Sequence, residues 1–291
     1  MVLRMPPVAV VTDTTHYAPA AVIEEYGIRQ VSLYVNEGAT QRRESEIGDF
    51  TAFYDGLRTA SELPTTSQPS IGDFLEVFTP LAQEGRDIVS VHLAGGISGT
   101  VDSARQAGEE LMRDHPQRRV IVIDSRKACG ALGFAAFAGA AVANGGGDVE
   151  QVAARIRETS EQVRLWFAVD TLEFLRRGGR IGAAQAWLGG ALKIKPILTV
   201  DGEITPIERV RTAGRAFERM VEFLRSQQAD GADGWMVQHI QAHDQAERLA
   251  DAGREIFGCD PVFVSEIGPV IGTHVGPGLL GVGGAPAALL R

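Results

Sequence analysis

Short apolar runs alternate with amphipathic stretches along the first half of the chain. The runs are rich in β-branched residues and apolar at successive positions, which is typical of strands buried on both faces. The stretches between them carry apolar residues at helical spacing. This alternation predicts a mostly parallel sheet covered by helices. The predicted strands are 8–13, 28–35, 87–94 and 118–124, and the predicted helices are 18–26, 71–83 and 98–114.

After about residue 164 the pattern changes to that of an α+β unit. Residues 194–210 are expected to form a hairpin, because Asp201-Gly202 is typical of a tight two-residue turn between strands. Further strands are predicted at 234–240 and 261–267, and helices at 212–227 and 244–257. We therefore predict an α/β protein of two domains. Residues 1–163 form an N-terminal domain with a mostly parallel sheet, and residues 164–291 form a C-terminal domain of α+β organisation.

Composition narrows the class of protein. The chain has 291 residues and a net charge of −9, which argues against nucleic acid or an anionic membrane as its partner. The first apolar run is too short for a signal peptide, and no stretch reaches membrane-spanning length, so we expect a cytoplasmic protein. Cys129 and Cys259 lie far apart in no metal-binding spacing, and we expect both to be buried and inert.

Three predicted strands of the first half end in polar or glycine-rich residues: 13–15, 95–100 and 124–125. Ligands of open α/β sheets bind beyond the carboxyl ends of the strands. In 95–100, glycines let backbone amides approach a ligand, and Ser98 would add a hydroxyl where the next helix begins. Anion binding and simple capping of that helix are both consistent with Ser98. A serine nucleophile is disfavoured, because Thr100 occupies the last glycine position of G-x-S-x-G.

Two other stretches carry polar groups suited to an anion. Ser70 and Asp73 fit a capping box, which leaves the hydroxyls of Thr66 and Ser67 free to bind a ligand. Residues 164–219 hold ten Lys/Arg and six Asp/Glu, hence +4, so the remainder carries −13. This segment, which includes Lys193, is either a solvated helix face or a patch for a phosphate or an acidic partner.

The stretch 268–281, GPVIGTHVGPGLLG, surrounds His274 with glycine and proline. Such backbone turns sharply or approaches another group closely. His274 is therefore either held against a ligand or placed in a structural turn. Among the remaining histidines, His239 and His243 have H-x-x-x-H spacing, but His239 falls in a strand pattern and not in a helix. We therefore predict no metal site.

Taken together, these stretches resemble the DegV family of bacterial fatty-acid-binding proteins. The segments that carry the likeness are VAVVTDTTHYAP, TTSQPS, GGISGTVDSAR, VIDSRKACGALG, LEFLRRGGRIG with the LKIKPIL, DGEI and VRT that follow it, and GPVIGTHVGPGLLGV. They occur in the family's order along essentially the whole chain. The family often has two serines where this chain has Ala94 and Gly95, which puts the number of headgroup hydrogen bonds in question.

The resemblance implies a carrier without catalytic residues or cofactor, similar to the lipid-carrying subunits of bacterial fatty acid kinases. A long-chain fatty acid would lie between the two domains, and a separate ATP-dependent kinase subunit would phosphorylate its carboxylate to an acyl phosphate. By position, the carboxylate would be bound by Thr66, Ser67, Ile97, Ser98 and His274. Arg180 and Arg211 would face the kinase or the phosphoryl group.

Two alternatives remain open from the residues. One is an acyl or phosphoryl transferase or hydrolase that uses Ser98 and His274. The other is a nucleotide or sugar-phosphate binder built on residues 95–100, although the chain lacks both G-x-x-x-x-G-K-[ST] and G-x-G-x-x-G.

Overall fold

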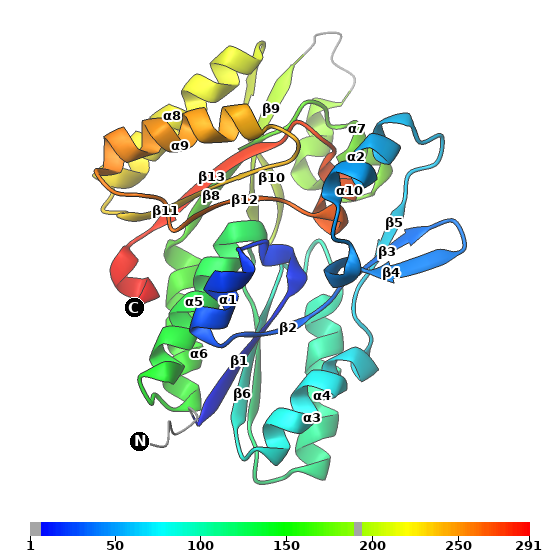
Figure 1. Cartoon of the computed structure of the whole chain (residues 1–291), viewed down its shortest axis with the longest axis vertical. Helices are drawn as coiled ribbons and strands as arrows, with labels where there is room; N and C mark the ends of the chain where they lie inside the picture. The colour runs from blue at the N-terminus through cyan, green and yellow to red at the C-terminus, as the bar shows by residue number, and fades with distance from the viewer. Residues whose placement is uncertain (1–6, 189–193) are drawn as a thin grey trace.

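The computed structural model describes residues 7–188 and 194–291, so Lys193 lies outside the described residues (Figure 1). The first half of the chain builds a parallel sheet in the order β2-β1-β6-β7, as predicted. Helices cover both faces: α3 and α4 on one side, and α1, α5 and α6 on the other. The bounds are β1 (Val8–Asp13), β2 (Arg29–Val31), β6 (Asp87–His92), β7 (Val120–Asp124), α1 (Ala20–Tyr26), α3 (Ile71–Gln83), α4 (Thr100–Asp114), α5 (Cys129–Asn144) and α6 (Val149–Gln162).

The predicted capping box at Ser70 is confirmed, and the structure shows a second box at Asp148. Ser70 and Asp73 form a reciprocal capping box at the start of α3. Asp148, at the end of the glycine run 145–147, forms another with Gln151 at the start of α6. Each box satisfies backbone N–H groups that have no partner within the helix.

The single strand predicted over 28–35 is wrong. The chain leaves the parallel sheet after β2, and residues from Tyr34 onward join a separate antiparallel sheet in the order β4-β3-β5. The apolar pattern continues across Ser32 because Val31 before it and Leu33 and Val35 after it are all buried. Val31 packs in the core beneath α3 and α4, whereas Leu33 and Val35 pack against residues of the second half. The elements of this excursion are β3 (Tyr34–Glu37), β4 (Thr40–Arg43), η2 (Glu44–Glu46), α2 (Phe50–Thr59) and β5 (Thr65–Ser67).

The second half builds a mixed six-stranded sheet in the order β10-β9-β8-β13-β11-β12, with α8 and α9 packed on one face. The predicted hairpin is confirmed, and its register pairs Asp201 with Glu203 across Gly202, whose φ is +81°. The bounds are β8 (Arg164–Ala168), β9 (Lys195–Asp201), β10 (Glu203–Val210), β11 (Gly234–His239), β12 (Phe263–Glu266), β13 (Leu280–Ala285), α7 (Glu173–Arg177), α8 (Ala213–Ala229), α9 (His243–Phe257) and α10 (Pro269–Val275).

The two sheets share an apolar interior. Helix α5 is buried on nearly all sides, and its Phe134 and Phe137 rings contact Phe263 of β12. A second cluster joins Leu33 and Tyr54 of the excursion to Phe167 of β8 and to α10. The excursion from Leu33 to Ser67 therefore packs against elements of the second half. The domain boundary between residues 163 and 164 stays a prediction.

The cysteine prediction is half wrong. Cys129 is buried at the start of α5, and burial raises the pKa of its thiol. Cys259 is exposed, because it follows α9 in a short connection on the surface rather than belonging to the next strand. In the part of the chain that the structure describes, no helix is long and apolar enough to cross a membrane.

Candidate functional site

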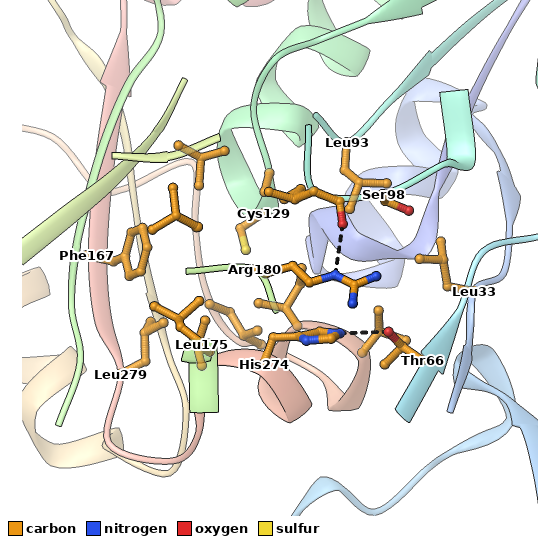
Figure 2. Close-up of a pocket in the computed structure, with 18 of the residues that line it drawn as sticks. Leu33, Thr66, Leu93, Ser98, Cys129, Phe167, Leu175, Arg180, His274 and Leu279 are labelled. Carbon is orange, nitrogen blue, oxygen red and sulfur yellow. Dashed lines mark hydrogen bonds between the residues drawn. The ribbon is translucent and has the colours of Figure 1, made fainter. Parts of the chain in front are cut away.

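A cavity of about 340 Å³ lies between elements of the two halves. Its wall is mainly apolar and combines residues from Leu33 to Cys129 with residues from Leu165 onward. Figure 2 shows Phe167, Leu175 and Leu279 gathered on one side of the cavity, and Ser98, Thr66 and Leu33 on the other. The volume falls within the range of about 300–1,000 Å³ that is usual for small-molecule sites.

Polar side chains gather at one end of this cavity (Figure 2). The Thr66 hydroxyl of β5 pairs with Nε2 of His274 on α10 at 2.7 Å. Arg180, just after α7, donates from Nε to the Ile97 carbonyl at 3.3 Å. Three separate parts of the sequence therefore meet at the polar end: the excursion, the 95–100 stretch and the second half.

His274 is neutral at physiological pH. Burial, with a smaller contribution from the charge of Arg180, lowers the pKa of its imidazole to about 4. Its Nδ1 is buried and, among the described residues, has no hydrogen-bond partner. A Cβ on Gly178 would lie 2.4 Å from that nitrogen, so Gly178 leaves the space that the ring occupies. The neutral imidazole makes one hydrogen bond at Nε2, which Thr66 takes here and which a ligand can take in its place without any change in the charge of the ring.

The 95–100 stretch contributes Ile97 and Ser98 to the cavity. Ser98 Oγ lies 2.8 Å from Thr100 Oγ1 and accepts a hydrogen bond from the Thr100 amide at 3.3 Å, so this hydroxyl supports the start of α4 and also faces the cavity. The neighbouring Gln68 side chain lies over Gly99, where a Cβ would come within 2.4 Å of it. Both alternatives stated for Ser98 are therefore compatible with its position.

The other predicted strand ends do not belong to this cavity. Asp13 is fully buried and accepts hydrogen bonds from Thr15, the Leu93 amide and His92. Burial alone would raise the pKa of Asp13, but these hydrogen bonds and the interaction with His92 lower it below its usual value. Asp124 binds the amides of Gly95 and Arg126.

Among the predicted contact residues, Thr66, Ser67, Ile97, Ser98, Arg180 and His274 line the cavity. Ser67 Oγ also accepts a hydrogen bond from Asn36 Nδ2 at 2.8 Å. Arg211 is exposed just after β10 and is not part of the cavity wall. Ala94 and Gly95 do not line the cavity either.

A nucleophile and base pair of Ser98 and His274 is not assembled. The Ser98 hydroxyl pairs with Thr100, and His274 pairs with Thr66. A second set, Ser90, His92 and Asp13, has the connectivity of a catalytic triad, at 2.6 and 3.0 Å. All three side chains are fully buried in the sheet, where a substrate does not reach the Ser90 hydroxyl. Among the described residues, no group of three or more His, Cys, Asp or Glu is arranged to hold a metal ion.

Sequence reasoning missed several residues of the site. Gly178 acts only through the space it leaves for His274, and Cys129 lines the cavity wall from the start of α5. The stretch around His274 was expected to turn, yet residues 269–275 form a helix. Its glycines admit aromatic rings: a Cβ on Gly272 would lie 2.1 Å from the Tyr54 hydroxyl. The glycines in this stretch correctly predicted that the backbone approaches other groups closely. They did not predict that residues 269–275 form a helix.

Comparison with known proteins gives the family. The sequence profile described as "Uncharacterised protein, DegV family" matches residues 7–287. The chain belongs to the DegV family. It is 41% identical over 278 residues to a DegV domain-containing protein of Streptomyces coelicolor, covering 94% of this chain and 97% of that protein.

Two solved structures of DegV proteins resemble the fold closely. One is described as fatty acid binding of a DegV family protein from Thermus thermophilus, with 33% identity, a TM-score of 0.85, and coverage of 96% of this chain and 99% of that one. The other is described as DegV, a fatty acid binding protein from Bacillus subtilis, with 34% identity and the same TM-score and coverage.

Proposed function

We propose that this chain binds a long-chain fatty acid in the cavity between its two halves. The carboxyl group would lie at the polar end, near Thr66, Ser67, Ile97, Ser98 and His274, and the tail would run along the apolar wall towards Phe167 and Leu279. The observation that carries the proposal is the arrangement of the wall, which is apolar over most of its extent and polar at one end. Fatty acid binding by the relatives from Thermus thermophilus and Bacillus subtilis supports it.

The tail and the carboxyl group of such a ligand would contribute unequally to the binding free energy. Burying a sixteen-carbon tail is worth roughly 12 kcal/mol before ordering costs, at about 0.8 kcal/mol per CH₂. A hydrogen bond from a neutral group contributes about 0.5–1.5 kcal/mol, and one to a charged group about 1.5–3 kcal/mol. The tail would therefore set most of the affinity, and the polar end would set the orientation of the carboxyl group.

We further propose that the bound carboxylate is presented to a separate ATP-dependent kinase subunit. Thr66, Arg180 and His274 also line an adjoining surface groove together with Arg177, so the polar end of the cavity lies beside the exterior. In this reaction a carboxylate oxygen attacks the γ-phosphorus of ATP, ADP leaves, and an acyl phosphate forms. Arg180 would approach the phosphoryl group, and exposed Arg211 would contact the kinase. The chain itself would hold the acid and exclude water from its tail.

Titration with hexadecanoic acid tests the binding site. Thr66→Val removes the hydroxyl that pairs with His274, and the loss of a hydrogen bond to the carboxylate is expected to weaken binding about tenfold, or about 1.4 kcal/mol. Thr65→Val changes the exposed neighbour on the same short strand and serves as the control. Equal affinities of the two variants would contradict the proposed headgroup position.

The presentation step has its own assay. The loaded protein is mixed with ATP and a bacterial fatty acid kinase subunit, and hydroxylamine traps any acyl phosphate as a hydroxamate. We expect hydroxamate only when both proteins are present. Hydroxamate from this chain and ATP alone would favour the enzyme alternative, and none from the complete mixture would contradict presentation.

A further inference from the structure

Helix α10 places His274 at the polar end of the cavity and is only seven residues long, so its position depends on what holds its ends. The first amides of a helix have no partner within the helix. Here the Val270 amide donates to Glu44 Oε1 at 2.7 Å, and the Ile271 amide donates to the Tyr17 hydroxyl at 3.1 Å. Both acceptors come from the first half of the chain, more than 200 residues away in the sequence.

Glu44 is the centre of this contact. Its side chain is buried, and its carboxylate accepts hydrogen bonds from the Tyr17 hydroxyl at 2.8 Å and from the Thr14 hydroxyl at 2.7 Å, in addition to the Val270 amide. In the described part of the chain, no cation forms an ion pair with it. We call Glu44, Thr14, Tyr17 and Val270 the Glu44 cluster. An apolar side chain at position 44 would leave three buried donors without an acceptor, which is costly.

The Glu44 cluster is closely packed against the start of α10. A Cβ on Gly268 would lie 2.6 Å from the Tyr17 ring and 3.0 Å from Glu44 Oε1. Tyr54 of α2 donates its hydroxyl to the carbonyls of Ile267 and Gly268, and Figure 1 shows α2 beside α10. Val270 and His274 are one helical turn apart, about 6 Å at 1.5 Å per residue. A displacement of the first turn therefore moves the imidazole relative to Thr66.

We propose that Glu44 is a positioning residue of the fatty-acid site. Its carboxylate ties the start of α10 to the first half of the chain and so sets where His274 lies at the polar end of the cavity. This inference rests on the proposed function, because it assigns Glu44 to the same headgroup site. Glu44 does not line the cavity and acts only through α10.

The ionisation of Glu44 gives this role a measurable signature. Burial raises the pKa of Glu44 to about 7, although hydrogen bonds from Thr14, Val270 and Tyr17 oppose the rise. The titratable groups that face it are Tyr17, Tyr54, Asp13 and Cys129, and the tyrosine and thiol pKa values lie well above neutrality.

The direction of the pH effect follows from linkage. The folded protein holds the Glu44 proton more tightly than the unfolded chain, whose carboxyl has a pKa near 4.5. The contribution of Glu44 to stability is therefore complete below about pH 4.5 and is lost as the pH rises towards 7. Above pH 7 this contribution no longer changes.

Three variants test the proposal in hexadecanoic acid titrations: Glu44→Ala, Glu44→Gln, and Glu46→Ala as a control on the exposed side of the same short helix. We expect Glu44→Ala to weaken binding at least tenfold. Glu44→Gln keeps an acceptor for Val270 and Tyr17 and should recover most of that loss, and Glu46→Ala should match the unaltered protein. Folded Glu44→Ala protein that binds within twofold of the unaltered protein would overturn the inference.

The imidazole signals of His274 provide a second readout, which remains decisive if Glu44→Ala does not fold. The pKa of His274 itself is about 4, so a change in its signals with a midpoint near pH 7 reports a neighbouring group. We expect that midpoint in the unaltered protein and its loss in Glu44→Gln. An identical titration in both proteins would overturn the positioning role. Failure of the unaltered protein to bind any fatty acid would instead refute the proposed function.

Discussion

Gly178 offers a sharp test of how the site is packed, because alanine there is excluded by its neighbours and not by its backbone. Its φ of −76° is open to any residue. A Cβ, however, would lie 2.4 Å from His274 Nδ1 and 3.2 Å from the Phe174 carbonyl oxygen. An ordinary contact needs about 1 Å more than the shorter distance. Either the imidazole is displaced, which disturbs its 2.7 Å pairing with Thr66, or the end of α7 shifts.

Two opposing contributions set the expected change in the free energy of unfolding of Gly178→Ala. Overpacking a dense site costs about 1–3 kcal/mol. Replacing glycine by alanine at a permissive φ stabilises by about 0.4–1 kcal/mol, because the unfolded chain loses freedom. We therefore expect Gly178→Ala to lower the free energy of unfolding by about 1–2 kcal/mol. If the imidazole moves, the loss of its proposed hydrogen bond to the carboxylate should also weaken fatty acid binding about tenfold.

Urea unfolding and hexadecanoic acid titration measure the two effects separately. Gly214→Ala in the first turn of α8 is the matched control, since a Cβ there meets nothing within 4 Å and the variant should bind normally. A Gly178→Ala protein that binds within twofold of the unaltered protein, with unchanged His274 signals, would refute the reasoning.

Two further predictions concern packing and thiol exposure. Gly272→Ala should destabilise the fold by about 3 kcal/mol in urea unfolding, because its Cβ would lie 2.1 Å from the hydroxyl of the fully buried Tyr54. Gly56→Ala on α2 meets open space and should stabilise by about 0.4–1 kcal/mol, so equal midpoints for the two variants would contradict this packing. In the native protein an aromatic disulfide reagent should modify exposed Cys259 quickly and Cys129 only after denaturation, because burial raises the pKa of Cys129. Rapid modification of both thiols would show that the cavity wall is open to solvent.

The hydrophobic pattern predicted the strands of the parallel sheet, and in the second sheet it predicted β9, β10, β11 and β12. It gave no prediction for the central strands β8 and β13 or for the small sheet β4-β3-β5. Strands such as Val8–Asp13 are buried at every residue, and that uniform burial appears directly as a continuous apolar run. The capping residues Ser70 and Asp148 act within four positions of themselves, so local sequence contains their whole interaction. The end of the parallel strand before Ser32 was not predicted. A hydrophobic pattern indicates that residues are buried, but it does not indicate which sheet they belong to.

The residues of the cavity site could be predicted from the sequence only in part, for a related reason. Thr66, Ser98 and His274 are polar residues in settings that predict ligand contact, and the resemblance to the DegV family brought them together. Glu44 lies in a polar stretch between half-buried Arg43 and exposed Ser45. Its burial depends on Tyr17 and on a helix more than 200 residues away. No pattern within its own stretch of sequence distinguishes it from solvated Glu46.

Native mass spectrometry of the purified protein, followed by denaturation and lipid analysis, tests the central claim most directly. The account predicts a species heavier than the chain by the mass of one fatty acid, and release of that acid on unfolding. A protein that is purified without ligand, and that binds none after incubation with fatty acids of several lengths, would contradict the account.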